Sequence, residues 1–264
     1  NKIPQVTAHL ENNFYHVILF QETWLNEKVS IEFPYYNLVR ADRKADTRNP
    51  HGGVAILVHS SIKFELVEFC NMDFVESIFV RVNYNNENIL IGSIYSPSSL
   101  SNAKSKSDFE KILAKPGPFL LAGDFNAKHT FWNNVKNCSK GIALEKVCEK
   151  NLCSVHYPEF YTLIPSTGDP SIIDFVISKG ISGITKPKSF DAFSSDHLPI
   201  TFEIPSCFNM SCSLKNPNFF QVYQEKNYSM LSIETSDYKQ SSSSLFKNPF
   251  NYYTFDEHMP NNSS

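Results

Sequence analysis

Five apolar segments of this sequence each carry an ionisable or hydrogen-bonding residue at or near one end. Each segment is short, rich in Ile, Val, Leu and Phe, and bounded by polar or turn-forming residues, which is typical of buried β-strands. In chain order the polar residues are Glu22 after "VILFQ", Tyr95 at the end of "LIGSIY", Asp124 and Asn126 in "FLLAGDFN", Asp174 within "SIIDFVIS", and Asp196 and His197 before "LPITFEI". Because ligands of α/β proteins bind at the ends of strands, we expect these side chains to converge on one site.

The first 204 residues alternate between strand-like and helix-like patterns. Expected strands cover residues 15–20, 54–58, 77–82, 89–95, 119–122, 172–178 and 199–204, with Asn85-Asn86 joining the third to the fourth. Expected helices run from Ile3 to the closing Asn12-Asn13, over about 107–115, and along the apolar positions from Leu144 to Asn151. With 41% hydrophobic and 14% aromatic residues in 264, the chain can build a sizeable core. The pattern predicts an α/β domain with substantial sheet.

The composition changes after residue 204. Residues 205–264 contain 12 Ser and 8 Asn, including four consecutive Ser at 241–244, and show no sustained periodicity. We therefore predict a domain over 1–204 and a polar, disordered tail over 205–264, whose aromatic residues leave room for a short docking segment.

Charge and cysteine content narrow the class of protein. The formal net charge is −3, so the chain has no global basic footprint for nucleic acid. Six scattered cysteines without a CxxC pair favour reduced thiols in an intracellular protein over a disulfide framework or a zinc site. No apolar run approaches the roughly 18 residues of a membrane span, and no secretory signal peptide or other targeting signal is readable.

The residue types at the strand ends fit phosphodiester chemistry. Carboxylates together with one Asn form an all-oxygen site of the kind that Mg²⁺ or Mn²⁺ prefers, and such an ion can polarise a phosphate. A His can act as general base, and a Tyr hydroxyl can donate to phosphoryl oxygens. Taken singly, most of these residues also have a structural interpretation as turn, helix-cap or core-edge residues. Asp174 fits that interpretation least, because a carboxylate inside a strand needs a partner.

Five motifs together resemble a known family. "QETWL", "IYSPSS", "GDFNAKH", "SIIDFVIS" and "SSDHLPI" occur in the order and approximate spacing of the endonuclease/exonuclease/phosphatase superfamily, in particular its branch in jockey-like non-LTR (LINE-type) retrotransposons. "ADRKADTRNPHGGVAILVH" is also similar to the segment that follows the Glu motif in that branch. The resemblance covers residues 1–204 and implies a four-layer α/β sandwich, in which two mixed sheets pack face to face with helices outside.

The resemblance implies a role for each matched residue. Glu22 would be the principal ligand of Mg²⁺ (or Mn²⁺), with Asp196 as a further or water-mediated ligand. His197 would act at the scissile phosphate, oriented by Asp174.

The remaining matched residues would handle the nucleophile and the phosphate. Asp124 would manage the proton of the water or leaving group, Asn126 would hold the nucleophile and phosphate, and Tyr95 would contact the phosphate. His129 belongs to the same motif, and both a DNA contact and a structural hydrogen bond remain open for it.

A DNA substrate is compatible with the charge balance. Residues 1–204 carry 20 Lys and Arg against 22 Asp and Glu, and setting aside the four site carboxylates leaves 18 acidic residues. Metal binding would therefore offset most of the acidity. Arg40 and Arg43 in "RADRKADTR" are candidate DNA contacts, although a solvated loop is an equally good interpretation of that segment.

The resemblance implies a DNA-nicking endonuclease whose 3′-hydroxyl product primes reverse transcription in the nucleus. A first strand carrying an Asn ligand would precede residue 1, so we expect an N-terminally truncated domain, with the first strand of the fold missing and activity in doubt. No Tyr-x-Asp-Asp polymerase signature occurs, so we expect the reverse transcriptase domain of a parent element to lie outside this chain. Two alternatives remain: an inactive remnant or nucleic-acid-binding module, and another phosphodiesterase of the superfamily, acting on abasic DNA, sphingomyelin or inositol phosphates.

Overall fold

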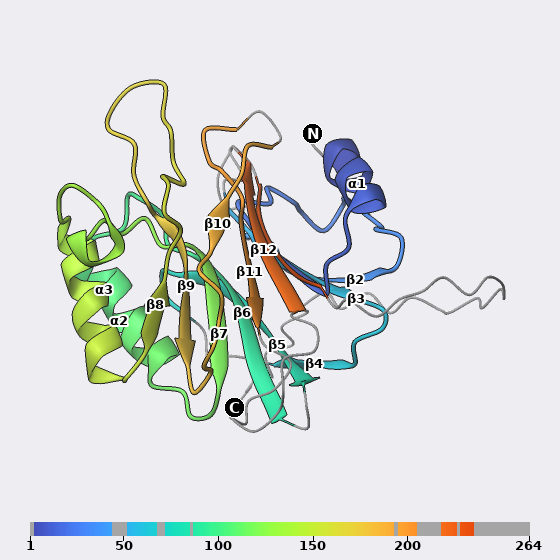
Figure 1. Cartoon of the computed structure of the whole chain (residues 1–264), viewed down its shortest axis with the longest axis horizontal. Helices are drawn as coiled ribbons and strands as arrows, with labels where there is room; N and C mark the ends of the chain where they lie inside the picture. Colours follow the sequence, from blue (N-terminus) through green and yellow to red (C-terminus); the bar gives the residue numbers. More distant parts are fainter. Residues whose placement is uncertain are drawn as a thin grey trace, which may run out of the picture.

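The chain folds into four layers, seen from the side in Figure 1. The computed structural model describes residues 3–43, 52–67, 72–84, 87–192 and 195–204, together with the backbone of two strands at 218–225 and 228–234. Two helices cover the outer face of a six-stranded sheet, a second layer of strands packs on its inner face, and a further helix lies outside that layer. This arrangement confirms the predicted fold class of packed sheets with helices outside.

The six-stranded sheet is mixed. Its strands are β4 (Phe64–Val67), β5 (Glu76–Tyr84), β6 (Glu87–Tyr95), β7 (Phe119–Asp124), β9 (Asp174–Lys179) and β8 (Ser154–His156), in this spatial order. Only the β6–β7 pair is parallel among these neighbours, and the other pairs are antiparallel. The parallel connection is made by a helix, as the geometry of a crossover requires.

The second layer consists of two groups of strands. One group has the order β1 (Val17–Gln21), β3 (Val54–His59) and β2 (Tyr36–Ala41), and the other has the order β10 (Lys188–Ser189), β11 (Ile200–Ile204), β12 (Asn218–Glu225) and β13 (Tyr228–Glu234). All pairs in both groups are antiparallel. The last strand, β13, lies beside β1, so the two groups meet there.

The helices are α1 (Ile3–Asn12), α2 (Asn102–Leu113), α3 (Ser139–Lys150) and the short 3₁₀ helix η1 (Thr130–Trp132). Helix α2 buries Phe109, Ile112 and Leu113 at helical spacing. Its Asp108 is fully buried, and its carboxylate accepts hydrogen bonds from three successive backbone N–H groups at 73–75. This contact anchors the segment before β5 to the helical layer.

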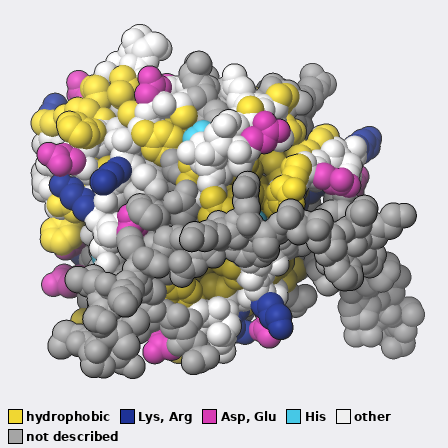
Figure 2. Space-filling model, turned by 45° about the vertical axis from the view of Figure 1, so that its right-hand side comes forward, with side chains coloured by type: hydrophobic (Ala, Val, Ile, Leu, Met, Phe, Trp, Pro, Cys, Tyr) yellow, Lys and Arg dark blue, Asp and Glu magenta, His cyan; other side chains and the backbone are white. Residues whose placement is uncertain are grey.

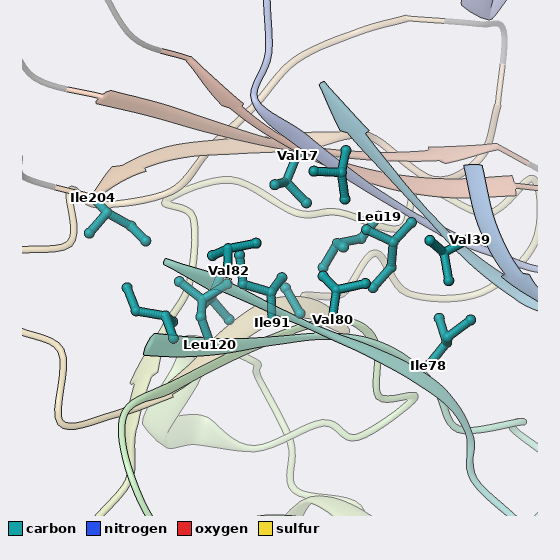
Figure 3. Packing of buried hydrophobic residues seen from close by; sticks show 14 of the residues in the cluster. Val17, Leu19, Val39, Ile78, Val80, Val82, Ile91, Leu120 and Ile204 are labelled. Carbon is teal, nitrogen blue, oxygen red and sulfur yellow. The ribbon is translucent and has the colours of Figure 1, made fainter. Parts of the chain in front are cut away.

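Three apolar clusters fill the three spaces between the layers. The cluster between the two strand layers joins residues of β1 and β3 to residues of β5, β6 and β7 (Figure 3). A second cluster lies between the six-stranded sheet and helices α2 and α3, and a third lies beneath α1. Each layer is therefore held by burial of apolar side chains on the face that it presents to its neighbour.

Most predicted elements are confirmed, with shifted ends. Helix α2 starts before the predicted 107 and α3 starts before 144, because their first turns are polar and carry no apolar periodicity. The sequence reading missed β2, β4, β8 and β10, which are short or alternate buried with exposed positions. The predicted turn at 85–86 lies outside the described residues.

Two strands, β12 and β13, occur within the segment predicted as a disordered tail. Both contain β-branched and aromatic residues whose contribution is lost when composition is averaged over 60 residues. The rest of 205–264 lies outside the described residues, so the predicted domain boundary at 204 stays a prediction. In the part of the chain that the structure describes, no helix is both long and apolar enough to span a membrane.

Candidate active site

Three neighbouring strands place Tyr95, Asp124 and Asp174 in one row. In the parallel β6–β7 pair Tyr95 is the partner of Asp124, and in the antiparallel β7–β9 pair Asp124 is the partner of Asp174. Paired residues on adjacent strands carry their side chains to the same face of a sheet. Tyr95 belongs to the apolar cluster between the two strand layers, so the row faces the second layer.

His197 joins this row from another part of the chain. Its Nδ1 lies 3.2 Å from Oδ2 of Asp174. The backbone N–H of Leu198 donates to the carbonyl of Thr162 over 2.6 Å, and Leu163 bridges His197 in an antiparallel arrangement. The Thr162 hydroxyl in turn accepts the N–H of Asp174 at 3.1 Å. The segment at 162–163 therefore holds both members of the His197–Asp174 pair.

Asp124 and Asn126 form a tight local unit at the end of β7. The Asn126 backbone N–H donates to Oδ1 of Asp124 over 2.8 Å, and its side-chain Nδ2 donates to Oδ2 over 2.6 Å. Asn126 adopts the left-handed conformation, with φ of 46°. This is the Asx-type turn of the structural interpretation, and it also places an amide beside the carboxylate row. Asp124 and Asn126 therefore form a local turn and are also part of the candidate site.

Glu22 reaches the row from the end of β1 through a strained turn. Its φ is 51°, which is uncommon for a residue with a side chain. The turn is held by two backbone hydrogen bonds, from Thr23 N–H to the Gly53 carbonyl at 3.1 Å and from Trp24 N–H to the Gly52 carbonyl at 2.8 Å. The Glu22 carboxylate hydrogen-bonds the Tyr95 hydroxyl. Glu22 and Tyr95 therefore meet across the two strand layers.

Glu76, which was not predicted from the sequence, extends the row to a fourth strand. In the β5–β6 pair Glu76 is the partner of Tyr95. Its carboxylate accepts the Gly53 backbone N–H and pairs with the Arg43 guanidinium. Burial raises the pKa of Glu76, the hydrogen bond from Gly53 and the charge of Arg43 oppose this rise, and the charge of Glu22 adds to it. Nothing in its local sequence distinguishes Glu76 from a solvated residue before a strand.

The row concentrates negative charge where water is excluded. Burial raises the pKa of Asp174 well above its ordinary value, the charges of Asp124 and Glu22 add to the rise, and a hydrogen bond from Thr162 opposes it. Burial likewise raises the pKa of the Tyr95 hydroxyl far above its usual range, with further contributions from Glu22 and Asp124. A cation bound in the row would relieve this repulsion.

The donor set fits a divalent metal ion. Asp124, Asp174 and His197 bring one potential ligand atom each to within 4.8 Å of one another. Oδ1 of Asp174 and Oδ1 of Asp196 are buried and have no hydrogen-bond partner among the described residues. Carboxylate oxygens left in this way suit a hard cation with oxygen ligands. The predicted ligand pair of Glu22 and Asp196 stays a prediction.

His197 is placed to act as a neutral imidazole. Burial lowers its pKa to about 4, and the charge of neighbouring Asp196 opposes that shift. Near neutral pH the ring therefore carries one proton, and the nitrogen without it can accept another. Asp196 itself is held by its main chain, since its carbonyl accepts the N–H of Ile164 at 2.7 Å.

The predicted DNA-contact residues have other partners in the structure. Nδ1 of His129 accepts the N–H of Phe131 at 3.1 Å, which caps η1. The Arg40 guanidinium donates to the carbonyls of Val29 at 2.7 Å and Asn26 at 3.2 Å, so it is engaged within the chain. Arg43, which pairs with Glu76, is 40% exposed. Contact of these residues with DNA stays a prediction.

The face drawn in Figure 2 shows the distribution of charged side chains among the described residues. On the face drawn in Figure 2, the Lys and Arg side chains of the described residues are interspersed with Asp and Glu. The row of paired strand residues therefore remains the feature that defines the site.

Comparisons with known proteins show which families and structures this chain is similar to. Residues 89–201 match the family described as Endonuclease-reverse transcriptase. The chain is 24% identical over 193 residues to an RNA-directed DNA polymerase from the mobile element jockey of Drosophila funebris, covering 71% of this chain and 20% of that protein. It is 26% identical over 245 residues to a probable RNA-directed DNA polymerase from the transposon X-element of Drosophila melanogaster, covering 89% of this chain and 26% of that protein. The chain thus spans about a fifth to a quarter of the length of these relatives.

Two solved structures share the fold of this chain. The endonuclease domain of TRAS1, a telomere-specific non-LTR retrotransposon, has a TM-score of 0.55 at 19% identity and covers 65% of this chain and 79% of that one. The catalytic domain of Xenopus laevis APE2 has a TM-score of 0.57 at 12% identity and covers 89% of each chain. The chain is therefore similar to the Endonuclease-reverse transcriptase family over residues 89–201 and to proteins of mobile elements over most of its length, and it shares the fold of these two solved structures.

Proposed function

We propose that this chain hydrolyses phosphodiester bonds of DNA with the help of a divalent metal ion, Mg²⁺ or Mn²⁺, and acts as the nicking domain of a non-LTR retrotransposon. The observation that carries the proposal is the His197–Asp174 contact of 3.2 Å, next to the paired carboxylate of Asp124. A neutral imidazole oriented by a carboxylate and surrounded by further acidic groups is suited to phosphoryl chemistry.

Each protein residue has a role that follows from its position in the site. Asp174 fixes the orientation of the His197 ring, whose other nitrogen interacts with the phosphate. Asp124 takes the proton of the attacking water, and Asn126, hydrogen-bonded to it, holds that water. The Tyr95 hydroxyl, which stays protonated and meets the Glu22 carboxylate in the structure, donates a hydrogen bond to a phosphoryl oxygen in place of that carboxylate when the substrate is bound.

The reaction consumes one water molecule. The water oxygen forms a bond to phosphorus as the bond from phosphorus to the 3′-oxygen breaks. The departing 3′-oxygen takes up a proton from solvent, which balances the proton that the water gives to Asp124, and the products are a 3′-hydroxyl and a 5′-phosphate. A divalent cation bound among Glu22, Asp124, Asp174 and Asp196 would stabilise negative charge on the phosphate.

The polymerase activity named for the relatives is not part of this proposal. The chain spans only 20–26% of their length, and no Tyr-x-Asp-Asp signature occurs in it. In the parent element the 3′-hydroxyl left by the nick would prime reverse transcription at nuclear DNA.

Nicking of a supercoiled plasmid tests the proposal. We expect conversion to the open circle with Mg²⁺ or Mn²⁺ and none with EDTA, and extension of the nick by a DNA polymerase would show the 3′-hydroxyl. His197→Ala and Glu22→Ala should abolish nicking, whereas Glu149→Ala, at an exposed position of α3, should leave it unchanged. Equal nicking by all variants would overturn the site. Metal-independent DNA binding without cleavage would favour a nucleic-acid-binding module.

A further inference from the structure

A buried lysine lies beside the active-site row without belonging to it. Lys140 is the second residue of α3 and is 5% exposed. Burying a lysine is costly unless its ammonium group finds partners. The Lys140 Nζ lies 2.7 Å from the Pro97 carbonyl, 3.2 Å from the Ser96 hydroxyl and 3.5 Å from the Ser96 carbonyl. Three oxygen acceptors thus match the three N–H groups of the ammonium.

These acceptors form the turn that directly follows Tyr95. Ser96 is fully buried, and its backbone N–H donates to the Asp124 carbonyl at 2.8 Å. Tyr95 itself is the strand partner of Asp124. Lys140 therefore binds the Ser96–Pro97 end of this turn. Tyr95 lies at the other end, and its hydroxyl meets the Glu22 carboxylate.

The first residues of α3, which carry Lys140, are held in place by close contacts with Lys128. A Cβ on Gly141 would lie 2.0 Å from the Lys128 carbonyl oxygen, so only glycine allows the helix to approach this closely. The Cys138 Sγ accepts the N–H groups of Lys128 at 3.1 Å and Gly141 at 3.3 Å. The segment that leads from Asn126 to Lys128 and the start of α3 are thereby joined.

We propose that Lys140 is a positioning residue for phosphodiester hydrolysis, since its ammonium group fixes the Tyr95–Ser96–Pro97 turn and thereby the Tyr95 hydroxyl. The inference rests on the proposed function, and Lys140 acts through Tyr95 without touching the substrate. Burial lowers the pKa of Lys140, and the charge of Asp124 opposes that shift, which agrees with a cation close to the row.

The substitution Lys140→Met keeps the length of the side chain and removes its N–H donors. We expect kcat to fall roughly 10- to 100-fold with little change in KM, because a displaced Tyr95 stabilises the transition state less well. Lys140→Arg retains positive charge and N–H donors and should recover part of the turnover. The matched control is Lys146→Met, which changes an exposed lysine of the same helix and should leave kcat unchanged.

A double variant tests whether Lys140 acts through Tyr95. If it does, Lys140→Met combined with Tyr95→Phe should be about as slow as Tyr95→Phe alone, because the turn then has no hydroxyl to position. Independent losses that multiply in the double variant would overturn the inference.

Hydrogen exchange provides a measurement that does not depend on turnover. The amides of residues 94–101 should exchange faster in Lys140→Met than in the wild type or in Lys146→Met, with no DNA present. Unchanged exchange in this segment would overturn the inference. If the wild type does not nick DNA, the proposed function fails, while exchange still decides whether Lys140 holds the turn.

A milder variant covers the case in which Lys140→Met does not fold, as judged by circular dichroism. Ser96→Ala removes the hydroxyl acceptor and keeps both carbonyl acceptors of Lys140. It should show a smaller fall in kcat and a smaller rise in exchange over 94–101. The absence of both effects in a folded protein would contradict the inference.

Discussion

Asp124, the last residue of β7, is directly paired with Asp174, the first residue of β9, so two buried carboxylates lie side by side at the ends of adjacent strands. The charge of Asp124 and burial together raise the pKa of Asp174. A stable domain has no structural use for such a pair, because two apolar residues would pack there without repulsion. The pair is therefore a cost to folding that a bound cation would offset.

Removing the charge of Asp174 should separate stability from activity. Because the folded state disfavours the ionised carboxylate at neutral pH, Asp174→Asn should stabilise the metal-free protein by roughly 1–2 kcal/mol, or about 2–8 °C in Tm. The same change should lower kcat for nicking by about 10²- to 10⁴-fold, because His197 loses its orienting carboxylate. Thermal unfolding in EDTA and plasmid nicking measure the two effects. A lower Tm in EDTA would contradict this account of the carboxylate pair.

Metal binding should stabilise the fold. Mg²⁺ or Mn²⁺ at about 100 times Kd should add about 2.7 kcal/mol to the free energy of unfolding, provided the unfolded chain does not bind the ion. Asp124→Asn should remove most of this gain, since Asp124 contributes to the cluster with Asp174 and His197. Glu149→Gln on α3 serves as the control. Equal gains in all three proteins would place the ion elsewhere.

Alanine substitutions at two glycines test whether Gly53 is needed to hold the turn at Glu22. Gly53 and Gly117 have φ of +90° and +84°, so alanine is strained at both, by about 1–3 kcal/mol. At Gly53 the added Cβ would also lie 2.5 Å from the Thr23 hydroxyl, whereas at Gly117 it would meet nothing within 4 Å. We expect Gly53→Ala to lose nicking activity and Gly117→Ala to retain it at a similar Tm. Equal activity of the two variants would show that the turn tolerates displacement.

The buried His9 should make the fold sensitive to acid. Its Nε2 lies 2.7 Å from the Tyr15 hydroxyl, and burial lowers its pKa to about 4. The unfolded chain then binds the proton at higher pH than the folded chain does, so His9 contributes nothing unfavourable above about pH 6.5 and destabilises the fold as the pH falls towards 4.

Partial exposure to solvent reduces this effect to about 1–2 kcal/mol. His9→Gln, which keeps a polar partner for Tyr15, should therefore show a shallower decline of Tm between about pH 7 and pH 4.5. A decline as steep as in the wild type would show that other groups cause the acid sensitivity.

The two arginines proposed for DNA contact should behave differently. Arg40→Ala should lower stability by about 1–3 kcal/mol, because it removes hydrogen bonds to the Val29 and Asn26 carbonyls, with little change in DNA affinity. Arg43→Ala should reduce the salt dependence of DNA binding by about one unit of slope if its exposed guanidinium meets a phosphate. Fluorescence anisotropy over a range of salt concentrations checks both. The same slope in both variants and the wild type would exclude both contacts.

The sequence predicts those candidate site residues that follow or lie within an apolar strand. Tyr95, Asp124 and Asp174 follow or lie in such segments, and the structure places them in one row. Glu76 and Lys140 were not predictable in this way, because a glutamate before a strand and a lysine in the first turn of a helix are ordinary solvated residues in sequence. The positions of these two residues beside the site become visible only in the structure, through the contacts of Glu76 with Gly53 and of Lys140 with Pro97.

The sequence by itself determined which segments are apolar enough to be strands, which polar residues they end in, and the family that this order of motifs resembles. The tertiary structure decided the strand register, and a slip of one residue between β7 and β9 would turn Asp174 away from Asp124. It also decided that Thr162 holds Asp174 and Leu198 together, although they are distant in sequence. Such pairings depend on how distant segments pack against one another, which a local sequence pattern does not reveal. The register of a strand is selected by the burial of a whole face and not by any one residue.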